Sequence, residues 1–260
     1  MALTYSKYLK LDQLLGLQAP RSDPEEHDEM LFIVIHQVYE LWFKLLLHEI
    51  DRCKREFTSH ELFAAIARFK RMRTVLKTLV EQIDILETMS PLSFLAFRDR
   101  LETASGFQSA QFRQVEFVLG FKRPEMLKHY EGEGALYESV AKRLHERSLV
   151  DHFYDLLAAL GTAIPEELRN KDVTAANGPH GDIQEAIIRI FEVEPAMLIL
   201  VELMTDFDEG LQEWRYRHVK MVERTIGNQR GTGGSPGVEF LKQSLFQPVF
   251  PDLWAIRSKL

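Results

Sequence analysis

Residues 30–50 read MLFIVIHQVYELWFKLLLHEI, the most apolar stretch of this 260-residue chain. Its apolar side chains fall on almost every side of a helix, which is typical of a helix enclosed in a core rather than lying on a surface. His36, Glu40 and Lys44 interrupt the stretch, whereas a membrane-spanning helix needs about 20 predominantly apolar residues. We therefore predict a buried core helix over Met30–Phe57 and no membrane contact.

Helical periodicity continues along the rest of the chain. Apolar residues recur every three or four positions, which predicts further helices at 61–89, 107–119, 135–160 and about 195–226. The Asn-Gly-Pro sequence within residues 165–182 predicts an exposed loop. No convincing alternating strand, internal repeat or low-complexity tract is found. We expect an all-α protein in which residues 1–260 form a single helical domain.

The composition narrows the possible functions. The formal net charge is −7 and the basic residues are scattered among acidic ones, so no nucleic-acid partner is expected. Cys53 is the single cysteine, which rules out an intramolecular disulfide, a Cys-rich zinc site and a haem attached through two thioether bonds. The N-terminal stretch MALTYSKYLKLDQLLG has no apolar run long enough for a signal peptide. A soluble, cytoplasmic protein is expected.

Nine histidines are the natural candidates for metal chemistry, yet their spacing predicts no metal cluster. No histidine follows a glutamate by three positions, and no His-Glu-x-x-His sequence occurs. A metal held by one histidine inside a helical core would indicate haem instead. His36 shares a helical face with Phe32 and Phe43, and His218 shares one with Trp214. Each taken alone is interpreted more simply as a core histidine bonded to a carbonyl.

Arg98 is a candidate for binding a carboxylate rather than a metal. It follows Phe94 and Phe97 in SFLAFRDRLETASGFQS, residues 93–109. Such an arginine either lays its stem over aromatic rings at the surface or presents its guanidinium to a carboxylate. Taken alone, Arg98 is better explained by the surface role.

The glycine-rich stretch RGTGGSPG, residues 230–237, is not a phosphate-binding loop. It lacks the lysine of a P-loop, and Pro236 stands where the dinucleotide-binding pattern needs its third glycine. Both patterns also follow a strand, whereas a helix is predicted here. The stretch is either a flexible linker or a loop that closes over a ligand through Thr232 and Ser235.

Taken together, four segments resemble the tryptophan 2,3-dioxygenase family. They are HDEMLFIVIHQVYELWFKLLLHEI, SFLAFRDRLETASGFQSAQFRQVEF, WRYRHVKMVERTIG and GTGGSPGVEFL, in the order of the family. The resemblance covers nearly the whole chain. It implies a haem enzyme that inserts both atoms of O₂ across the indole C2=C3 bond of L-tryptophan. The product is N-formyl-L-kynurenine, in the first step of tryptophan catabolism by the kynurenine route.

The resemblance also implies how the cofactor is held. One non-covalent b-type haem per subunit would be buried between the long helices, with His218 as the proximal iron ligand. His36 would be the distal, catalytic histidine, close to the indole N–H of the substrate. Ser105 and Gly106 would lie on the distal side of the haem.

The remaining implied residues bind L-tryptophan. Phe32 and Phe94 would pack against the indole ring, although position 94 is tyrosine in some family members. Arg98 would bind the carboxylate, and Thr232 would help to bind the ammonium and carboxylate groups. The family forms homotetramers in which an N-terminal arm, about residues 1–20, reaches a neighbouring subunit, and the arm would contribute Tyr5, Tyr8 and Leu9.

Three other functions are weighed against this one. A haem sensor or carrier would keep His218 but would not need Arg98 and Thr232 arranged for an amino acid. A broader indole-oxidising haem enzyme would not require the substrate carboxylate. A helical interaction protein would bind no haem, so both histidines would be structural.

Overall fold

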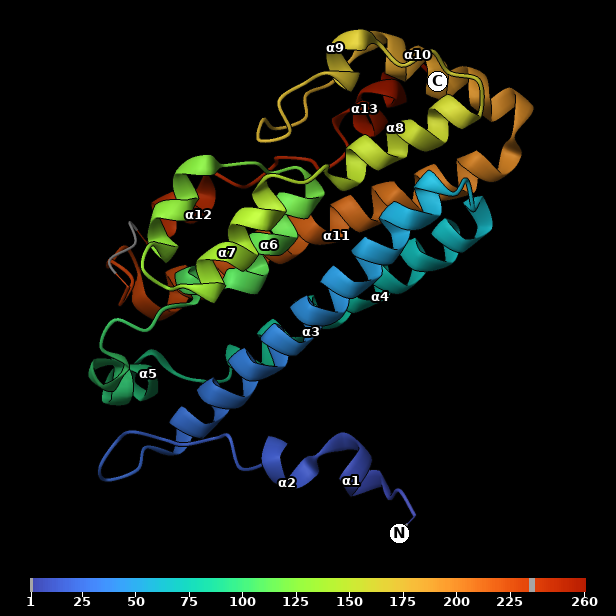
Figure 1. Ribbon diagram of the computed structural model, residues 1–260. Helices are drawn as coiled ribbons and strands as arrows, with labels where there is room; N and C mark the ends of the chain where they lie inside the picture. Colours follow the sequence, from blue (N-terminus) through green and yellow to red (C-terminus); the bar gives the residue numbers. More distant parts are fainter. Residues whose placement is uncertain (1, 234–236) are drawn as a thin grey trace.

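The computed structural model describes residues 2–233 and 237–260 as an elongated assembly of helices (Figure 1). No strand occurs in these residues, which confirms the all-α prediction. Four short 3-10 helices lie at Asp99–Leu101, Gly106–Gln108, Pro124–Tyr130 and Ile256–Ser258. The α-helices are α1 (Tyr5–Leu9), α2 (Leu11–Leu14), α3 (His27–Thr58), α4 (Leu62–Leu86), α5 (Pro91–Arg98), α6 (Ala110–Leu119), α7 (Ala135–Leu144), α8 (Leu149–Ala159), α9 (Glu166–Arg169), α10 (Gly181–Val193), α11 (Pro195–Ile226), α12 (Val238–Lys242) and α13 (Pro251–Ala255).

Three long helices, α3, α4 and α11, form the frame that positions the site. α3 and α4 are antiparallel and are joined by the short turn at 59–61 (Figure 1). α4 and α11 run in the same direction, because the ion pairs Arg73–Asp206 and Asp84–Arg217 ascend along both helices. α11 has the predicted bounds, with Pro195 in its first turn, where a missing N–H has no cost.

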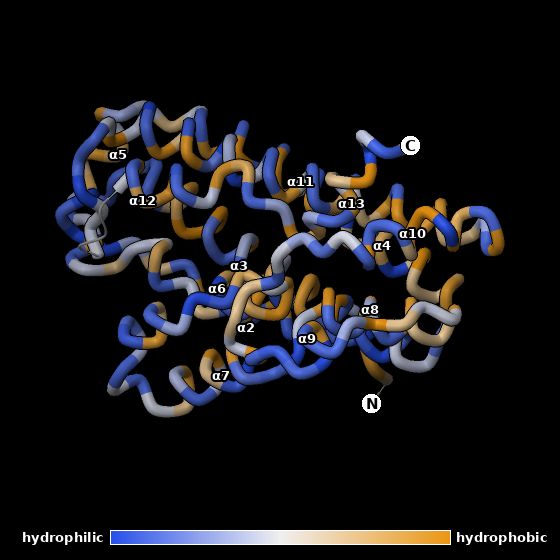
Figure 2. Tube along the Cα trace, turned by 90° about the horizontal axis from the view of Figure 1, so that it is seen from above, coloured by the Kyte–Doolittle hydropathy of each residue, from blue (hydrophilic) through white to orange (hydrophobic). Residues whose placement is uncertain are grey.

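The main core lies where these helices meet α6, α8, α10 and α13. Phe57, Phe69 and Phe207 are 0–1% exposed. The Phe57 and Phe69 rings are stacked with centroids 6.0 Å apart, and Phe207 meets Phe69 edge to face at 5.8 Å. Each such ring contributes roughly 1.5–3 kcal/mol when it is fully buried. Hydrophobic and hydrophilic residues alternate along the helices (Figure 2), as expected of amphipathic helices around a shared core.

The prediction that α3 is enclosed on all sides is wrong for its N-terminal half. Ile50 and Phe57 are fully buried, but Met30, Val34 and Leu41 are 37–50% exposed. Within the described residues, α3 is also the one helix long and apolar enough to cross a membrane by length and composition. A core helix passes the same test, and the C-terminal half of α3 packs against α4, α6 and α8.

The single helix predicted over 135–160 is two helices, α7 and α8. Ser148 and Asp151 form a capping box that starts α8, in which each side chain bonds to the backbone N–H of the other. The Lys122 ammonium donates hydrogen bonds of 2.8–2.9 Å to the carbonyls of Arg143, Leu144 and Glu146, and so completes the end of α7. Helix ends leave such carbonyls unpaired, and a buried cation satisfies them.

The predicted loop at 165–182 is shorter and more firmly attached than expected. It includes α9, and α10 begins at Gly181, a helix that the periodicity did not reveal. Lys171 pairs with Asp151 at 2.8 Å, and the Asn177 amide donates to the Ser148 hydroxyl at 2.9 Å. The loop is therefore tied to the start of α8.

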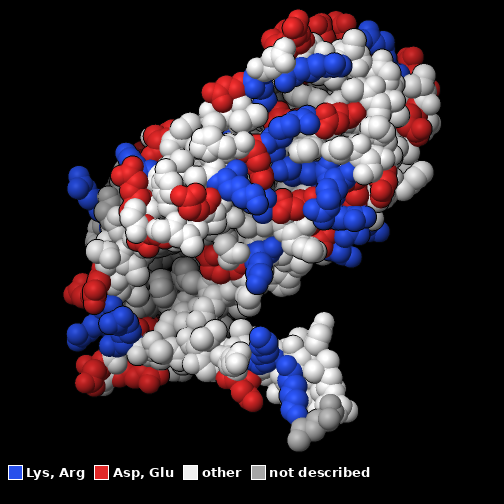
Figure 3. Space-filling model, viewed as in Figure 1, with Lys and Arg blue, Asp and Glu red and all other residues white. Residues whose placement is uncertain are grey.

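The N-terminal arm differs from the rest of the chain. α1 and α2 contain no buried residue, and they stand apart from the body in Figures 1 and 3. The amide of Gln18 donates to the Gln37 side chain on α3 at 2.6 Å. On the face drawn in Figure 3, basic and acidic side chains are interspersed over the body.

Candidate active site

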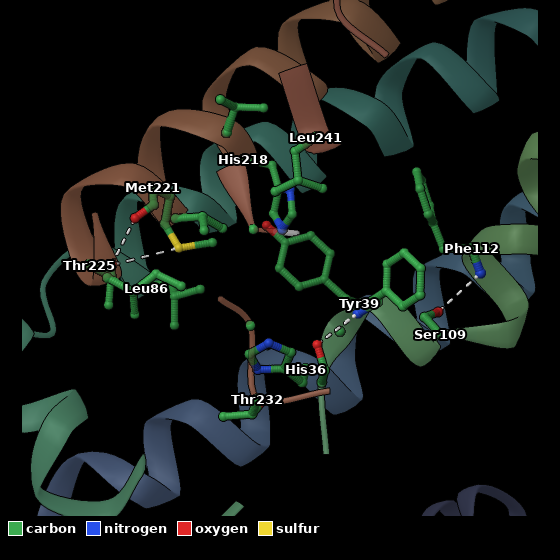
Figure 4. Close-up of a pocket in the computed structure, with 18 of the residues that line it drawn as sticks. His36, Tyr39, Leu86, Ser109, Phe112, His218, Met221, Thr225, Thr232 and Leu241 are labelled. Carbon is green, nitrogen blue, oxygen red and sulfur yellow. Dashed lines mark hydrogen bonds between the residues drawn. The ribbon is translucent and has the colours of Figure 1, made fainter. Parts of the chain in front are cut away.

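A cavity of about 270 Å³ opens between α3, α5, α11, α12 and the segment that follows α5. It is lined mainly by apolar side chains, with a few charged ones at its edges. Figure 4 shows His36 on α3 and His218 on α11 reaching into this space from opposite sides. The structure brings eight of the eleven predicted site residues to the cavity wall, and these are Phe32, His36, Phe94, Arg98, Ser105, Gly106, His218 and Thr232.

His218 presents a neutral imidazole to the cavity. Its ring lies nearly parallel to that of Trp214, one turn earlier, with centroids 5.3 Å apart. Burial lowers the pKa of His218 to about 4, and His36 adds a smaller effect in the same direction. Among the described residues the His218 ring has no hydrogen-bond partner. A neutral imidazole with an unused lone pair is the form that binds a metal.

His36 is fixed in one tautomer by its own helix. Its Nδ1 lies 2.7 Å from the carbonyl oxygen of Phe32, one turn earlier, and a carbonyl can only accept. Nδ1 therefore carries the proton, and Nε2 keeps a lone pair. Burial is the main cause of a lowered pKa for His36, so the ring is neutral at pH 7. His36 can accept a hydrogen bond from a ligand in the cavity.

An aromatic cluster forms the wall beside His36. The Phe32 ring lies 4.1 Å from the His36 ring and 5.8 Å from the Phe94 ring, between centroids. Phe97, which is fully buried, supports both phenylalanines from behind at 5.5 Å. Ser90 caps α5 and Pro91 occupies its first turn, which sets the direction of Phe94. Such a wall suits a flat apolar ring.

Arg98 and Thr232 both line the cavity, and each donates hydrogen bonds to other residues of the same chain. The Arg98 guanidinium donates to the Gln229 side chain and, at 2.8 Å, to the carbonyl of Arg230. The Thr232 hydroxyl donates to the carbonyl of Ala104. Residues 229–232 therefore pack against the segment that follows α5.

Ser105 and Gly106 lie opposite that stretch, at the start of the short helix Gly106–Gln108. The Ser105 side chain and Gln108 form a capping box there. Gly233 packs so closely that a Cβ atom on it would lie 2.8 Å from the Ser105 Cβ. This close approach explains one glycine of the glycine-rich stretch. Ser235 lies outside the described residues.

Sequence reasoning missed a cluster of charged side chains that lines the cavity. Glu116 pairs with Arg113, Arg123 and Arg215, which leaves the cluster with excess positive charge. Three buried N–H groups of the wall have no partner among the described residues, and these are the Nε atoms of Arg113 and Arg215 and the indole Nε1 of Trp214. Arg113 and Glu116 are three positions apart, but Arg215 is about a hundred residues away. No local pattern could have joined them.

Three predicted site residues do not reach the cavity of their own chain. Tyr5 and Tyr8 on the arm are 75% and 70% exposed, and Leu9 is 40% exposed. None of them lines the cavity. Their predicted contact with a substrate is therefore not made within this chain and stays a prediction.

Fold and site together define an all-helical protein with an apolar cavity that is faced by two neutral imidazoles and edged by guanidinium groups. The family model described as tryptophan 2,3-dioxygenase matches residues 1–144 and 180–260. The chain belongs to this family. It is 52% identical to the tryptophan 2,3-dioxygenase of Herpetosiphon aurantiacus, over 100% of this chain and 99% of that protein. Its identity is 48% to the enzyme of Anaeromyxobacter sp. (strain K), over 100% and 97%, and 41% to that of Bacillus thuringiensis subsp. konkukian, over 99% and 93%.

Proposed function

We propose that this chain is a haem-dependent dioxygenase that converts L-tryptophan and O₂ to N-formyl-L-kynurenine. The indole C2=C3 bond is broken and both oxygen atoms enter the product, so no external reductant is consumed. The observation that carries the proposal is the pair of neutral imidazoles, His36 and His218, facing one apolar cavity from two helices. The family supports tryptophan as the substrate.

The cavity suits a haem on two independent grounds. His218 has a neutral imidazole whose ring nitrogens are not bonded to any described residue, so one of them could bind the iron of a haem. The unpaired N–H groups of Arg113, Trp214 and Arg215 suit the carboxylates of a haem, since buried donors without partners are costly. The haem, when bound, supplies the redox-active iron that activates O₂. Ser105 and Gly106 would line the face of the cofactor opposite His218.

The protein's own residues then orient the amino acid. Phe32 and Phe94 pack on the indole ring, and the lone pair on Nε2 of His36 accepts a hydrogen bond from the indole N–H. The Arg98 guanidinium binds the carboxylate through two parallel hydrogen bonds, and Thr232 contacts the ammonium group. Holding both ends of the substrate converts an encounter into a positioned reaction.

The full site needs more than one chain in this proposal. We infer a homotetramer in which the arm of one subunit covers the cavity of its neighbour. The support is that Tyr5, Tyr8 and Leu9 are exposed and stand outside their own cavity. A cytoplasmic enzyme is proposed as well.

A single anaerobic experiment tests the proposed function. The reduced protein is examined by absorption spectroscopy, and O₂ and L-tryptophan are then added in turn. We expect a haem spectrum and, once both are present, the absorbance of N-formylkynurenine. Product formation from tryptamine at an equal rate would contradict the role of the carboxylate. A coloured protein that makes no product would be a haem sensor or carrier.

A further inference from the structure

The Arg98 guanidinium already has two acceptors without any substrate. Nη1 donates to the side-chain oxygen of Gln229, and Nη2 donates to the main-chain carbonyl of Arg230 at 2.8 Å. Two oxygens on two different Nη atoms resemble the way in which a carboxylate binds an arginine. The chain therefore supplies an internal substitute for the group that Arg98 would bind.

The backbone of Gln229 is held by a hydrogen bond of 3.2 Å from its N–H to the carbonyl of Ile226, whereas its side chain bonds to Arg98. Its side chain is exposed, and it follows the last turn of α11, beyond Gly227. The other acceptor is main chain, so position 229 is the one at which a substitution changes the contact. Both acceptors are neutral amide oxygens, so only the donor of these two bonds is charged. A carboxylate adds a negative charge on the acceptor side and accepts through two parallel bonds, so it is the stronger partner for Arg98.

We propose that Gln229 is an internal competitor that sets the affinity for the substrate carboxylate, because its side-chain oxygen accepts from the Arg98 guanidinium until a ligand carboxylate replaces it. This inference rests on the proposed function, because Arg98 must be the group that binds the carboxylate. A ligand with a carboxylate exchanges a neutral acceptor for a charged one and gains from the exchange. A ligand without one cannot displace Gln229 and gains nothing at this end of the cavity.

Thr232 takes no part in this exchange. Its hydroxyl donates to the Ala104 carbonyl, and the lone pairs of its oxygen stay free to accept from a ligand ammonium. Discrimination therefore arises at Arg98, where only a ligand with a carboxylate offers a stronger acceptor than Gln229.

A graded set of variants at position 229 tests the proposal. The protein with its cofactor, kept free of O₂, is titrated with L-tryptophan and with tryptamine in a calorimeter. Gln229→Ala removes the competitor and should lower the Kd for L-tryptophan by about three- to tenfold, the net worth of one solvent-exposed hydrogen bond. Gln229→Glu supplies a charged competitor and should raise that Kd by about tenfold. Tryptamine binding should stay within about twofold in both variants.

Two further variants separate the possible failures. Asn228→Ala alters the neighbouring exposed residue and should leave both affinities unchanged. Arg98→Lys keeps the charge but loses the fork, and it should weaken L-tryptophan binding markedly. Unchanged affinity in Arg98→Lys would overturn both the role of Arg98 and this inference. Weaker binding in Arg98→Lys combined with unchanged or weaker binding in Gln229→Ala would overturn the inference alone.

Discussion

Burial gives the two cavity histidines different roles although both are neutral. His36 donates its only N–H, on Nδ1, to the Phe32 carbonyl, so its Nε2 presents a lone pair to the cavity in a fixed direction. His218 has no polar contact among the described residues, and its lone pair is free for a metal. A histidine held by its helix suits orientation of a substrate, and a neutral histidine with a free ring nitrogen facing the cavity suits coordination.

This difference predicts unequal effects of two alanine substitutions. His218→Ala should lose the haem, since no other histidine of the described residues reaches the cavity except His36. His36→Ala should retain haem but lose roughly 10- to 100-fold in activity, as expected when a positioning contact is removed. Haem content per subunit and turnover of L-tryptophan are measured on both. Normal haem content in His218→Ala would contradict its role, and complete loss of activity in a haem-loaded His36→Ala would contradict positioning.

At the scale of helices, the sequence predicts what is encoded locally. Pro195 and the glycine after Ile226 bound α11 correctly because both act within one turn. The break between α7 and α8 was missed although Ser148 and Asp151 carry a local capping signal. Lys122, which completes the end of α7, comes from a different part of the chain and gives no local signal. The site divides in the same way. The His36–Phe32 contact follows from helical spacing, whereas the meeting of Arg215 with Glu116 needs the tertiary fold.

The contact between α3 and α8 leads to a prediction on pH. Burial lowers the pKa of His152 from a reference of 6.5 to about 4. The positive charges of Lys54 and Arg147 lower this pKa further, whereas the negative charges of Asp155 and Asp151 raise it. The folded state keeps His152 neutral while the unfolded chain takes up a proton near pH 6.5. The stability that the neutral ring contributes is therefore present above pH 6.5 and is lost as the pH falls toward 4.

The loss attributable to His152 should be about 2 kcal/mol between pH 7 and pH 5, from about 1.4 kcal/mol per unit of pKa shift. Urea unfolding of the native protein and of His152→Gln at both pH values measures it. The variant should show a correspondingly smaller loss on acidification. Equal losses in the two proteins would contradict a depressed pKa at this position.

At the scale of the whole molecule, one side of the chain leaves apolar surface exposed. Helices α1 and α2 of the arm contain no buried residue, and Met30, Val34 and Leu41 on α3 are exposed. Exposed apolar patches mark surfaces that bind another protein, a membrane or a ligand, and the proposed homotetramer offers another subunit as the partner. An exchanged arm would cover it and bring Tyr5 and Tyr8 to a neighbouring cavity, so assembly and substrate binding would depend on each other.

Complementation between two damaged subunits tests this arrangement. Arg98→Ala has a defective cavity and an intact arm, whereas Tyr8→Ala has an intact cavity and a defective arm. Each variant alone should bind and turn over L-tryptophan poorly. When the two are co-expressed, an Arg98→Ala arm can complete a Tyr8→Ala cavity, and random pairing should restore about one cavity in four. Light scattering should give four times the 30.2 kDa of one chain. If the arm served its own chain, co-expression would give only the average of the two single variants, because no exchange could assemble a complete site.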